Sequence, residues 1–524
     1  MHARSNQLEA QLPRGQGPRL DNIAEDVQYI IAAELANTSP PSIFALAQSS
    51  HSLRQAALPF IYRVVVLTRE EDEAKKQEAY EALIGQFRGR GKCSIAHHVR
   101  SLVIKDEIPT DDLMMILDTI DELGVLQKLS WETTAHIPPR VLDKLHHTWP
   151  DLELTVHVLL RKHSKNHVHR QMDGKLLSSS LLRSLTYEVI YEGYQADHPA
   201  SQEWAKITRA ISAGGNLRML KVHMKECREE PENDSQVELS RDRRLPALEE
   251  FTLYGAYSYN WSDDHCRMLA DSVDLSTLHT LNLSSGMPTT FFKAFTGRLP
   301  GLKTLRVEIR RNVNVDSTAS FISAVNTLQS LDIDGPTSVV DILWPAIVQH
   351  RATLTDICLR KHVSLGRLEE IMKTFPSVKR LGWNVPYEDQ SNYLGFISCM
   401  KLERLQIFLH LPGTSSNYCG ELIAERMGEM RSPALDKEGS QAAAVAIMQN
   451  LTALEGHKIE RLTLHLMRTA CWDRGDPYKL WAKLQVRQHE HPGKQVKFEF
   501  LGKQRWTYED EVEEELELDW PVAL

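Results

Sequence analysis

Apolar residues recur along most of the chain in one short phrase, apolar-x-x-apolar-x-apolar, where x is any residue. Clear copies begin at residues 99, 126, 182, 217, 248, 278, 302, 328, 354, 378, 402 and 459. From 248 to 402 the starts fall 30, 24, 26, 26, 24 and 24 residues apart, a spacing that chance alternation would not maintain. The alternation within each copy predicts a short strand.

The strand period also assigns the two faces of each predicted strand. Leu305 and Leu331 are predicted to point into the core, while Arg306 and Asp332, one residue along, turn to the opposite face. We therefore expect truncation of either leucine to destabilise the protein by about 2–5 kcal/mol. Substitution of Arg306 or Asp332 is expected to cost little.

Segments between the copies have helical spacing. Leu368, Ile371, Met372 and Phe375 follow the i, i+3, i+4, i+7 pattern of a buried helix face. A degenerate copy near Leu152 fills the long gap between the copies at 126 and 182. Each unit is then one strand and one helix, and neither buries its apolar face alone, so the units are predicted to stack into a parallel-strand α/β solenoid. The alternative is a set of unrelated strand–helix units in an open sheet.

The repeat resembles the leucine-rich repeat family over roughly residues 95–500. The family's Asn or Cys after the strand is missing, because the corresponding positions hold Ala256, Gly286, Arg310, Pro336, His362, Pro386 and His410. The resemblance therefore implies an irregular horseshoe with uneven loops. The charged stretch 226–244 and the stretch 412–458 interrupt the repeat and are predicted insertions, with a helix expected over 440–456.

A different apolar pattern precedes the repeats, over residues 20–67. Ile30, Ile31 and Leu35 have helical spacing, the chain breaks near Pro40 and Pro41, and two further short apolar faces follow. Three helices in so few residues are close to the lower size limit for an independent core, which lies at about 40 residues. We expect some of this apolar surface to be left for a partner.

This N-terminal pattern is similar to an F-box of the kind that fungal proteins join to leucine-rich repeats. The resemblance rests on Ile23-Ala24-Glu25-Asp26-Val27, on Leu46 with Ser49, Ser50, Leu53 and Arg54, and on Leu58-Pro59-Phe60-Ile61-Tyr62-Arg63 followed by a valine run. The family's first proline is Ala24 here. The resemblance implies contact with the Skp-type adaptor of SCF (cullin–RING) ubiquitin ligases, through Ile23, Val27, Ile31, Leu35, Leu46, Leu53, Leu58 and Pro59. For each of these residues the alternative is packing within the three-helix unit.

Charge and composition narrow the class of protein. The net charge is −9, but residues 509–519 carry eight acids and no base, so the remainder is nearly neutral, and no general nucleic-acid binder is expected. No secretory or membrane-spanning segment is apparent, and the seven scattered cysteines are expected to be reduced, which places the protein in the cytoplasm and/or nucleus. The expected order is a disordered segment 1–19, an F-box 20–67, a connecting helix and turn 68–94, a solenoid 95–503 and an acidic tail 504–524.

No catalytic, nucleotide-binding or metal-binding motif is recognisable. His157, His163, His167 and His169 lack a carboxylate or thiol at ligand spacing, so no metal or cofactor is expected. The resemblance implies a non-catalytic substrate-recognition subunit of an SCF-type ligase; the alternatives are a scaffold that directs no ubiquitylation and an enzyme with an unrecognised site. A protein substrate is expected on the concave face. Arg360, Arg380 and Arg404 form its candidate patch, unless they pair with Asp356, neighbouring acids or the acidic tail.

Overall fold

The computed structural model places the chain in two compact units, residues 1–157 and 158–524. The residues that it describes are 20, 23–38, 40–68, 74–88, 95–133, 135–158, 174–190, 207–208, 212, 215–225, 246–255, 259, 261–284, 288–309, 315–362, 364–386, 393, 402–411, 447, 461–471, 477–487 and 497–505. The predicted insertions 226–244 and 412–458, apart from residue 447, lie outside these residues, as does the chain after residue 505.

The first unit begins with three helices, α1 (Glu25–Thr38), α2 (Pro40–Ser49) and α3 (His51–Ile61). Their core contains Ala32, Leu46 and Leu53, against which Leu35 and Phe60 pack. At the start of α3, the side chain of Ser50 accepts a hydrogen bond from the Leu53 amide, which satisfies one of the free donors at a helix start. The three predicted helices are confirmed.

A buried glutamine ties these helices together. Gln28 of α1 donates from Nε2 to the Ile23 carbonyl over 2.9 Å, and its Oε1 accepts from Ser52 Oγ over 2.5 Å. The bonds join the turn before α1 to α3, so the position of α1 is fixed by polar contacts as well as by the small core.

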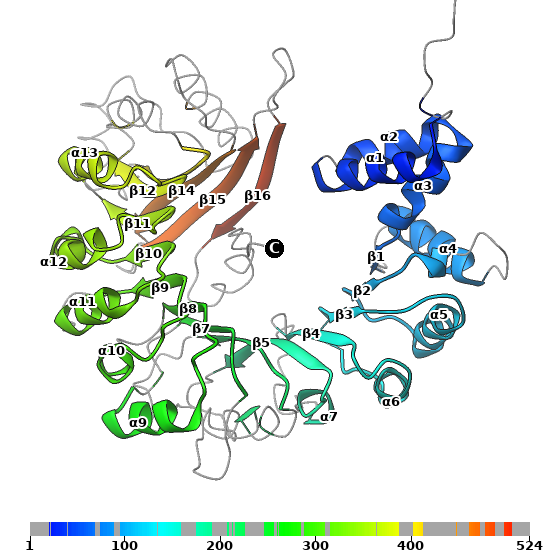
Figure 1. The fold of residues 1–524 in the computed structure, drawn as a ribbon, viewed down its shortest axis with the longest axis horizontal. Helices are drawn as coiled ribbons and strands as arrows, with labels where there is room; N and C mark the ends of the chain where they lie inside the picture. Colours follow the sequence, from blue (N-terminus) through cyan, green and yellow to red (C-terminus); the bar gives the residue numbers. More distant parts are fainter. Residues whose placement is uncertain are drawn as a thin grey trace, which may run out of the picture. The chain divides into compact units, whose positions relative to one another are not determined.

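A parallel sheet follows in the first unit. Strands β1 (Val64–Leu67), β2 (Ser101–Ile104), β3 (Lys128–Trp131) and β4 (Glu153–Val158) pair in chain order. Helices α4 (Ala74–Arg88), α5 (Thr110–Leu123) and α6 (Pro139–Thr148), with the 3-10 turn η2 (Ile95–His97), connect them (Figure 1). The valine run that follows Arg63 is therefore the first strand of the sheet. The strand predicted near Leu152 is confirmed as β4.

The second unit continues the alternation of strand and helix. Its strands are β5 (Leu182–Ile190), β6 (Met219–Lys225), β7 (Glu250–Gly255), β8 (Thr280–Ser284), β9 (Thr304–Glu308), β10 (Ser330–Asp334), β11 (Asp356–His362), β12 (Arg380–Pro386), β13 (Arg404–Leu411) and β14 (Arg461–Cys471). All of these pair in parallel with their neighbours. The described helices are α7 (Gly174–Leu177), α9 (Asp263–Ser272), α10 (Thr289–Phe295), α11 (Val315–Ala324), α12 (Thr337–Val348) and α13 (Leu365–Thr374).

The register confirms the leucine positions predicted from the repeat. Leu281, Leu305, Leu331, Ile357, Leu381, Leu405 and Leu462 are paired from strand to strand and all are buried. Helices α9–α13 lie along one face of the sheet (Figure 1), and aromatic residues fill the layer of helices, with Phe292 of α10 4.9 Å from Phe321 of α11 between ring centroids. We call the opposite face of the sheet, which bears Arg306 and Asp332, the inner face.

The sheet ends differently from the prediction. Strands β15 (Pro477–Arg487) and β16 (Lys497–Arg505) pair antiparallel, β15 with β14 and β16 with β15. A repeat of strand and crossover helix would have given parallel strands. Alternating sequence predicts a strand but not its direction, because the connection decides direction.

Candidate functional site

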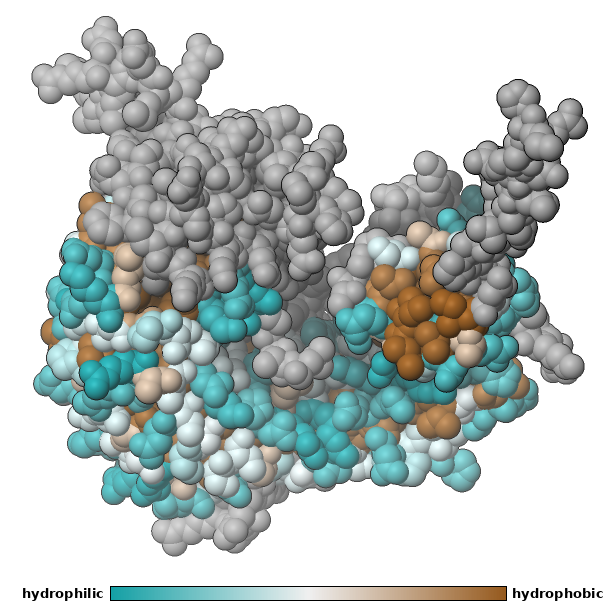
Figure 2. Space-filling view, turned by 45° about the horizontal axis from the view of Figure 1, so that its top comes forward, coloured by the Kyte–Doolittle hydropathy of each residue, from teal (hydrophilic) through white to brown (hydrophobic). Residues whose placement is uncertain are grey.

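The three-helix unit exposes large apolar side chains. Exposed fractions are 38% for Val27, 64% for Ile30 and 54% for Phe44, and Leu20 and Tyr29 are also exposed. Val27 and Ile30 are one turn apart on α1 and Phe44 lies on α2. Figure 2 shows hydrophobic side chains gathered at this part of the surface. We call these five residues the N-terminal apolar surface.

The residues predicted to contact an adaptor divide into exposed and packed positions. Val27 is exposed, whereas Leu46 and Leu53 lie in the core of the three helices. Ile23, Ile31, Leu35, Leu58 and Pro59 are half-buried. For Leu46 and Leu53 the structure shows the packing alternative.

Tyr29, Ile30 and Phe44 were missed as surface candidates. The signal was present in α1, EDVQYIIAAELANT, where apolar residues extend around more than one face of the helix. A unit of this size cannot bury all of them. Tyr29 covers Phe60 of α3, with ring centroids 4.8 Å apart, so this side chain is partly used within the unit.

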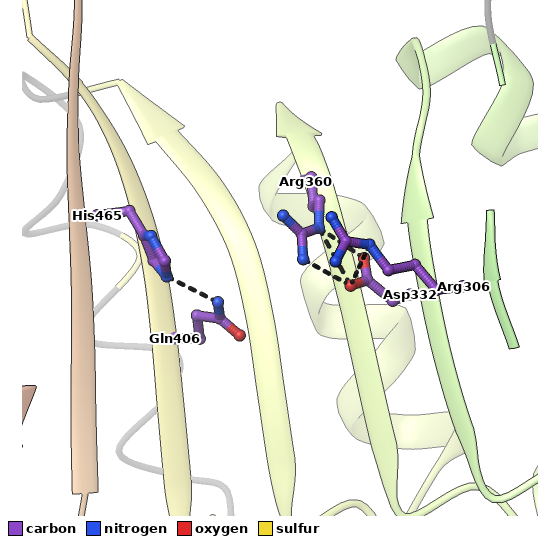
Figure 3. Close-up of polar contacts among 5 residues, drawn as sticks. All are labelled: Arg306, Asp332, Arg360, Gln406 and His465. Atoms are coloured by element: carbon purple, nitrogen blue, oxygen red, sulfur yellow. Dashed lines mark hydrogen bonds and ion pairs between the residues drawn. The ribbon is translucent and has the colours of Figure 1, made fainter. Parts of the chain in front are cut away.

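A buried ion-pair cluster occupies the inner face of the second unit. Asp332 of β10 is 4% exposed. It accepts hydrogen bonds from Arg360 Nε at 2.9 and 3.1 Å and from Arg360 Nη2 at 2.8 Å, and it lies 3.6 Å from Arg306 Nε (Figure 3). The two arginine side chains are themselves only 13% (Arg306) and 10% (Arg360) exposed. Asp332 does face away from the helices, as predicted, but the expectation that its substitution costs little is revised by this burial.

The electrostatics of Asp332 follow from its neighbours. Burial by itself raises the pKa of this carboxyl, but the two guanidinium groups and the hydrogen bonds from Arg360 and Cys358 outweigh burial, so the pKa lies below its usual range. Burial and the adjacent Asp332 carboxylate hold the pKa of the Cys358 thiol well above its usual range. Cys358 is therefore a neutral hydrogen-bond donor and not a nucleophile.

The three arginines predicted as a substrate patch have different surroundings. Arg360 is bound to Asp332, and its guanidinium carbon also lies 5.2 Å from the ring centre of Phe408. Arg380 Nε is 2.9 Å from Asp356 Oδ1. Arg404 is paired with Arg380 in the sheet, and both arginines act on Asp356. The structure thus shows pairing with neighbouring acids, the alternative considered above, for Arg360 and Arg380.

Burial has the larger effect on Asp356. It raises the pKa of this carboxyl, a hydrogen bond from Thr355 and the charges of Arg380 and Arg404 act in the opposite direction, and the net direction is upward.

An aromatic and amide group continues the inner face towards β14. The rings of Phe408 and His465 are stacked with centroids 4.6 Å apart, and Gln406 Nε2 lies 2.8 Å from His465 Nε2 (Figure 3). These side chains offer polar and aromatic contacts to a ligand but no nucleophile with an adjacent base. The described part of the chain contains no group of three or more His, Cys, Asp or Glu residues that could hold a metal ion.

None of the helices that the structure describes is both long and apolar enough to cross a bilayer. Of the four histidines considered as a metal cluster, only His157 lies within the described residues.

In comparisons with known proteins, no family model matches the chain and the curated proteins contain no match to it.

Proposed function

We propose that this protein is the substrate-recognition subunit of an SCF-type ubiquitin ligase, with residues 20–67 acting as an F-box and the repeats binding a protein substrate. The observation that carries the proposal is the N-terminal apolar surface on a three-helix unit. Exposed apolar side chains of this size, gathered on one small unit, mark a protein-binding surface. The motif quoted above, from Leu46 to Arg63, selects the Skp-type adaptor as its partner.

The strand–helix repeat supports the second half of the proposal. The described helices α9–α13 lie on the other face of the sheet (Figure 1). The inner face presents charged, amide and aromatic side chains from successive strands, among them Asp332, Gln406 and Phe408. A receptor of this kind needs no catalytic residue, because it accelerates ubiquitin transfer by holding the substrate close to the charged carrier. The protein would act in the cytoplasm or nucleus, where the ligase components are.

The adaptor contact is tested by charge substitutions on the exposed side chains. Ile30→Asp and Phe44→Asp, each made in the full chain co-expressed with a Skp-type adaptor, are expected to reduce co-purification at least tenfold, because each would place an unpaired carboxylate in an apolar interface. Val125→Asp and Ile342→Asp are matched controls, since both side chains are more than half exposed elsewhere on the surface. Equal adaptor recovery with Ile30→Asp and with the controls would rule out this surface.

A second measurement separates a ligase receptor from a scaffold. If the proposal is correct, a cullin is recovered together with the adaptor, and ubiquitylated proteins accumulate on the complex when the proteasome is inhibited. Recovery of the adaptor without a cullin would identify the protein as a scaffold.

A further inference from the structure

Helix α1 begins without the residue types that start other helices of the chain. In three described helices a serine side chain accepts a hydrogen bond from the first turn, namely Ser50 for α3, Ser262 for α9 and Ser364 for α13. Four others begin directly after a proline, namely Pro109, Pro138, Pro288 and Pro336. The residue before α1 is Ala24, whose carbonyl accepts from the Val27 and Gln28 amides over 3.0 Å but whose methyl side chain accepts nothing. The start of α1 is therefore held by other contacts.

The buried side chain of Gln28 supplies these contacts. It is 1% exposed, and its Nε2 donates to the Ile23 carbonyl over 2.9 Å and to the Leu20 carbonyl over 3.3 Å. Its Oε1 accepts from Ser52 Oγ of α3 over 2.5 Å. One side chain thus binds the segment before α1 at one end of its amide and α3 at the other. We call Gln28, Ser52 and the carbonyls of Leu20 and Ile23 the glutamine clasp.

The clasp determines which side of α1 faces outward. Successive residues of an α-helix are about 100° apart around its axis, so Ile30 points about 200° away from Gln28. With Gln28 directed at α3, Ile30 is 64% exposed, and Val27 and Tyr29 are exposed as well. The carbonyl of Leu20 is itself an acceptor in the clasp. Of the N-terminal apolar surface, all members except Phe44 therefore take their positions from the segment that the clasp holds.

Apolar packing by itself leaves this rotation weakly specified. The core of the unit is small, and α1 carries apolar residues on more than one face, so a rotation that turned Ile30 inward would also bury an apolar side chain. Hydrogen bonds are directional, and a buried amide that loses its partners is costly. The clasp therefore distinguishes between rotations of α1 that apolar burial alone does not.

We propose that Gln28 is a positioning residue, which together with Ser52 fixes the rotation of α1 so that Val27 and Ile30 are presented to the partner. This inference rests on the proposed function, which identifies the partner as the Skp-type adaptor, and it adds the internal residues on which that contact depends. Gln28 acts through α1 and not by touching the adaptor, because its side chain is 1% exposed.

The test measures adaptor affinity and hydrogen exchange on the same full-length samples. Gln28→Leu keeps an apolar side chain of similar size but removes the hydrogen bonds of the clasp, and it is expected to weaken adaptor binding about tenfold. Amides in the first two turns of α1 should exchange about tenfold faster in the free protein. Ser52→Ala should weaken adaptor binding in the same direction, whereas Ser52→Thr keeps the hydroxyl and should bind like wild type.

Ala24→Pro separates order at the helix start from rotation of the helix. Proline at this place starts four other helices of the chain, and no described residue accepts a hydrogen bond from the Ala24 amide, so the substitution removes no bond. Added to Gln28→Leu, it is expected to restore slow exchange in α1 but not adaptor affinity, because proline fixes the start of a helix and not its rotation against α3. Ala57→Gly, at a fully buried position of α3 outside the clasp, is the control for stability alone and should leave affinity within about twofold of wild type.

Two outcomes would overturn the inference. One is adaptor binding by Gln28→Leu and Ser52→Ala that equals wild type while Ile30→Asp abolishes it, which would leave the proposed function standing. The other is recovery of affinity together with slow exchange when Ala24→Pro is added, which would give Gln28 a purely structural role. Absence of adaptor binding in the wild-type chain would instead remove the proposed function, and this inference with it.

Discussion

Removing the charge of Asp332 should destabilise the protein far more than its place on the inner face suggests. Asp332→Asn keeps the shape of the side chain but removes the carboxylate that pairs with Arg306 and Arg360, at sites where their side chains are only 13% and 10% exposed. Breaking a buried ion pair by removing one partner costs about 3–5 kcal/mol. Because the carboxylate contacts two guanidinium groups, we expect a loss within this range.

The assay is urea unfolding followed by circular dichroism, with the midpoint compared at an unchanged slope. Asp334→Asn is the matched control, since Asp334 is half-buried two residues along the same strand, and an exposed or half-exposed ion pair contributes about 0–1 kcal/mol. Asp332→Leu combined with Arg306→Met and Arg360→Met should recover much of the loss, because apolar residues often replace a buried ion-pair cluster at little cost. A loss below about 1 kcal/mol for Asp332→Asn would refute the burial argument.

The pH dependence provides an independent check. The pKa of Asp332 is lower in the folded protein than in the unfolded chain, so its contribution is complete above the unfolded pKa of about 3.9 and is lost as the pH falls through the lowered folded value. Wild-type stability should therefore fall over this acidic range. The difference between wild type and Asp332→Asn should shrink over the same range.

Three further predictions concern the core and the packing of the repeats. Leu305→Ala, at a fully buried repeat position, should lower the unfolding free energy by about 2–5 kcal/mol in urea titrations, and a loss near zero would contradict the strand register. His265 is buried and its pKa is lowered to about 4, against about 6.5 when unfolded, so stability should fall by about 3 kcal/mol between pH 6.5 and 4 because the unfolded chain binds the proton first; His265→Phe should flatten this slope. Gly382→Ala would place a Cβ 2.8 Å from Cys358 Sγ and should lower the unfolding free energy by about 1–3 kcal/mol in thermal unfolding. Gly366→Ala, which has open space in α13, should leave stability unchanged or raise it. Adding Cys358→Ala should rescue the first variant and should not change the second.

The strands could be predicted from the sequence because the same apolar pattern recurs in every copy of the repeat. The apolar positions from Leu281 to Leu462 are all buried in the same way, and they pair with one another from strand to strand. Their spacing in the sequence therefore indicates the register of these strands. The helices between them were predicted from apolar period alone, as in the segment that forms α13. Such local patterns are sufficient when every unit packs only against its neighbours.

The contacts on the inner face could not be predicted in the same way. Arg360 and Asp332 are 28 residues apart and become partners only when the strands are paired. Even with the register known, an arginine reaches across strands, so its choice between Asp332, Asp356 and a ligand depends on side-chain geometry.

The antiparallel end of the sheet also has a consequence for self-association. Among the described strands, β16 pairs with β15 alone, so it is the last strand of the sheet. An edge strand is a template on which a second copy of the chain could add its own strand, and basic residues are a common defence against this. Strand β16, KFEFLGKQR, carries Lys497, Lys503 and Arg505, so two copies meeting edge to edge would bring six positive charges together against two glutamates. Of the strands that the structure describes, the last one therefore has a charge that opposes edge-to-edge pairing of two copies.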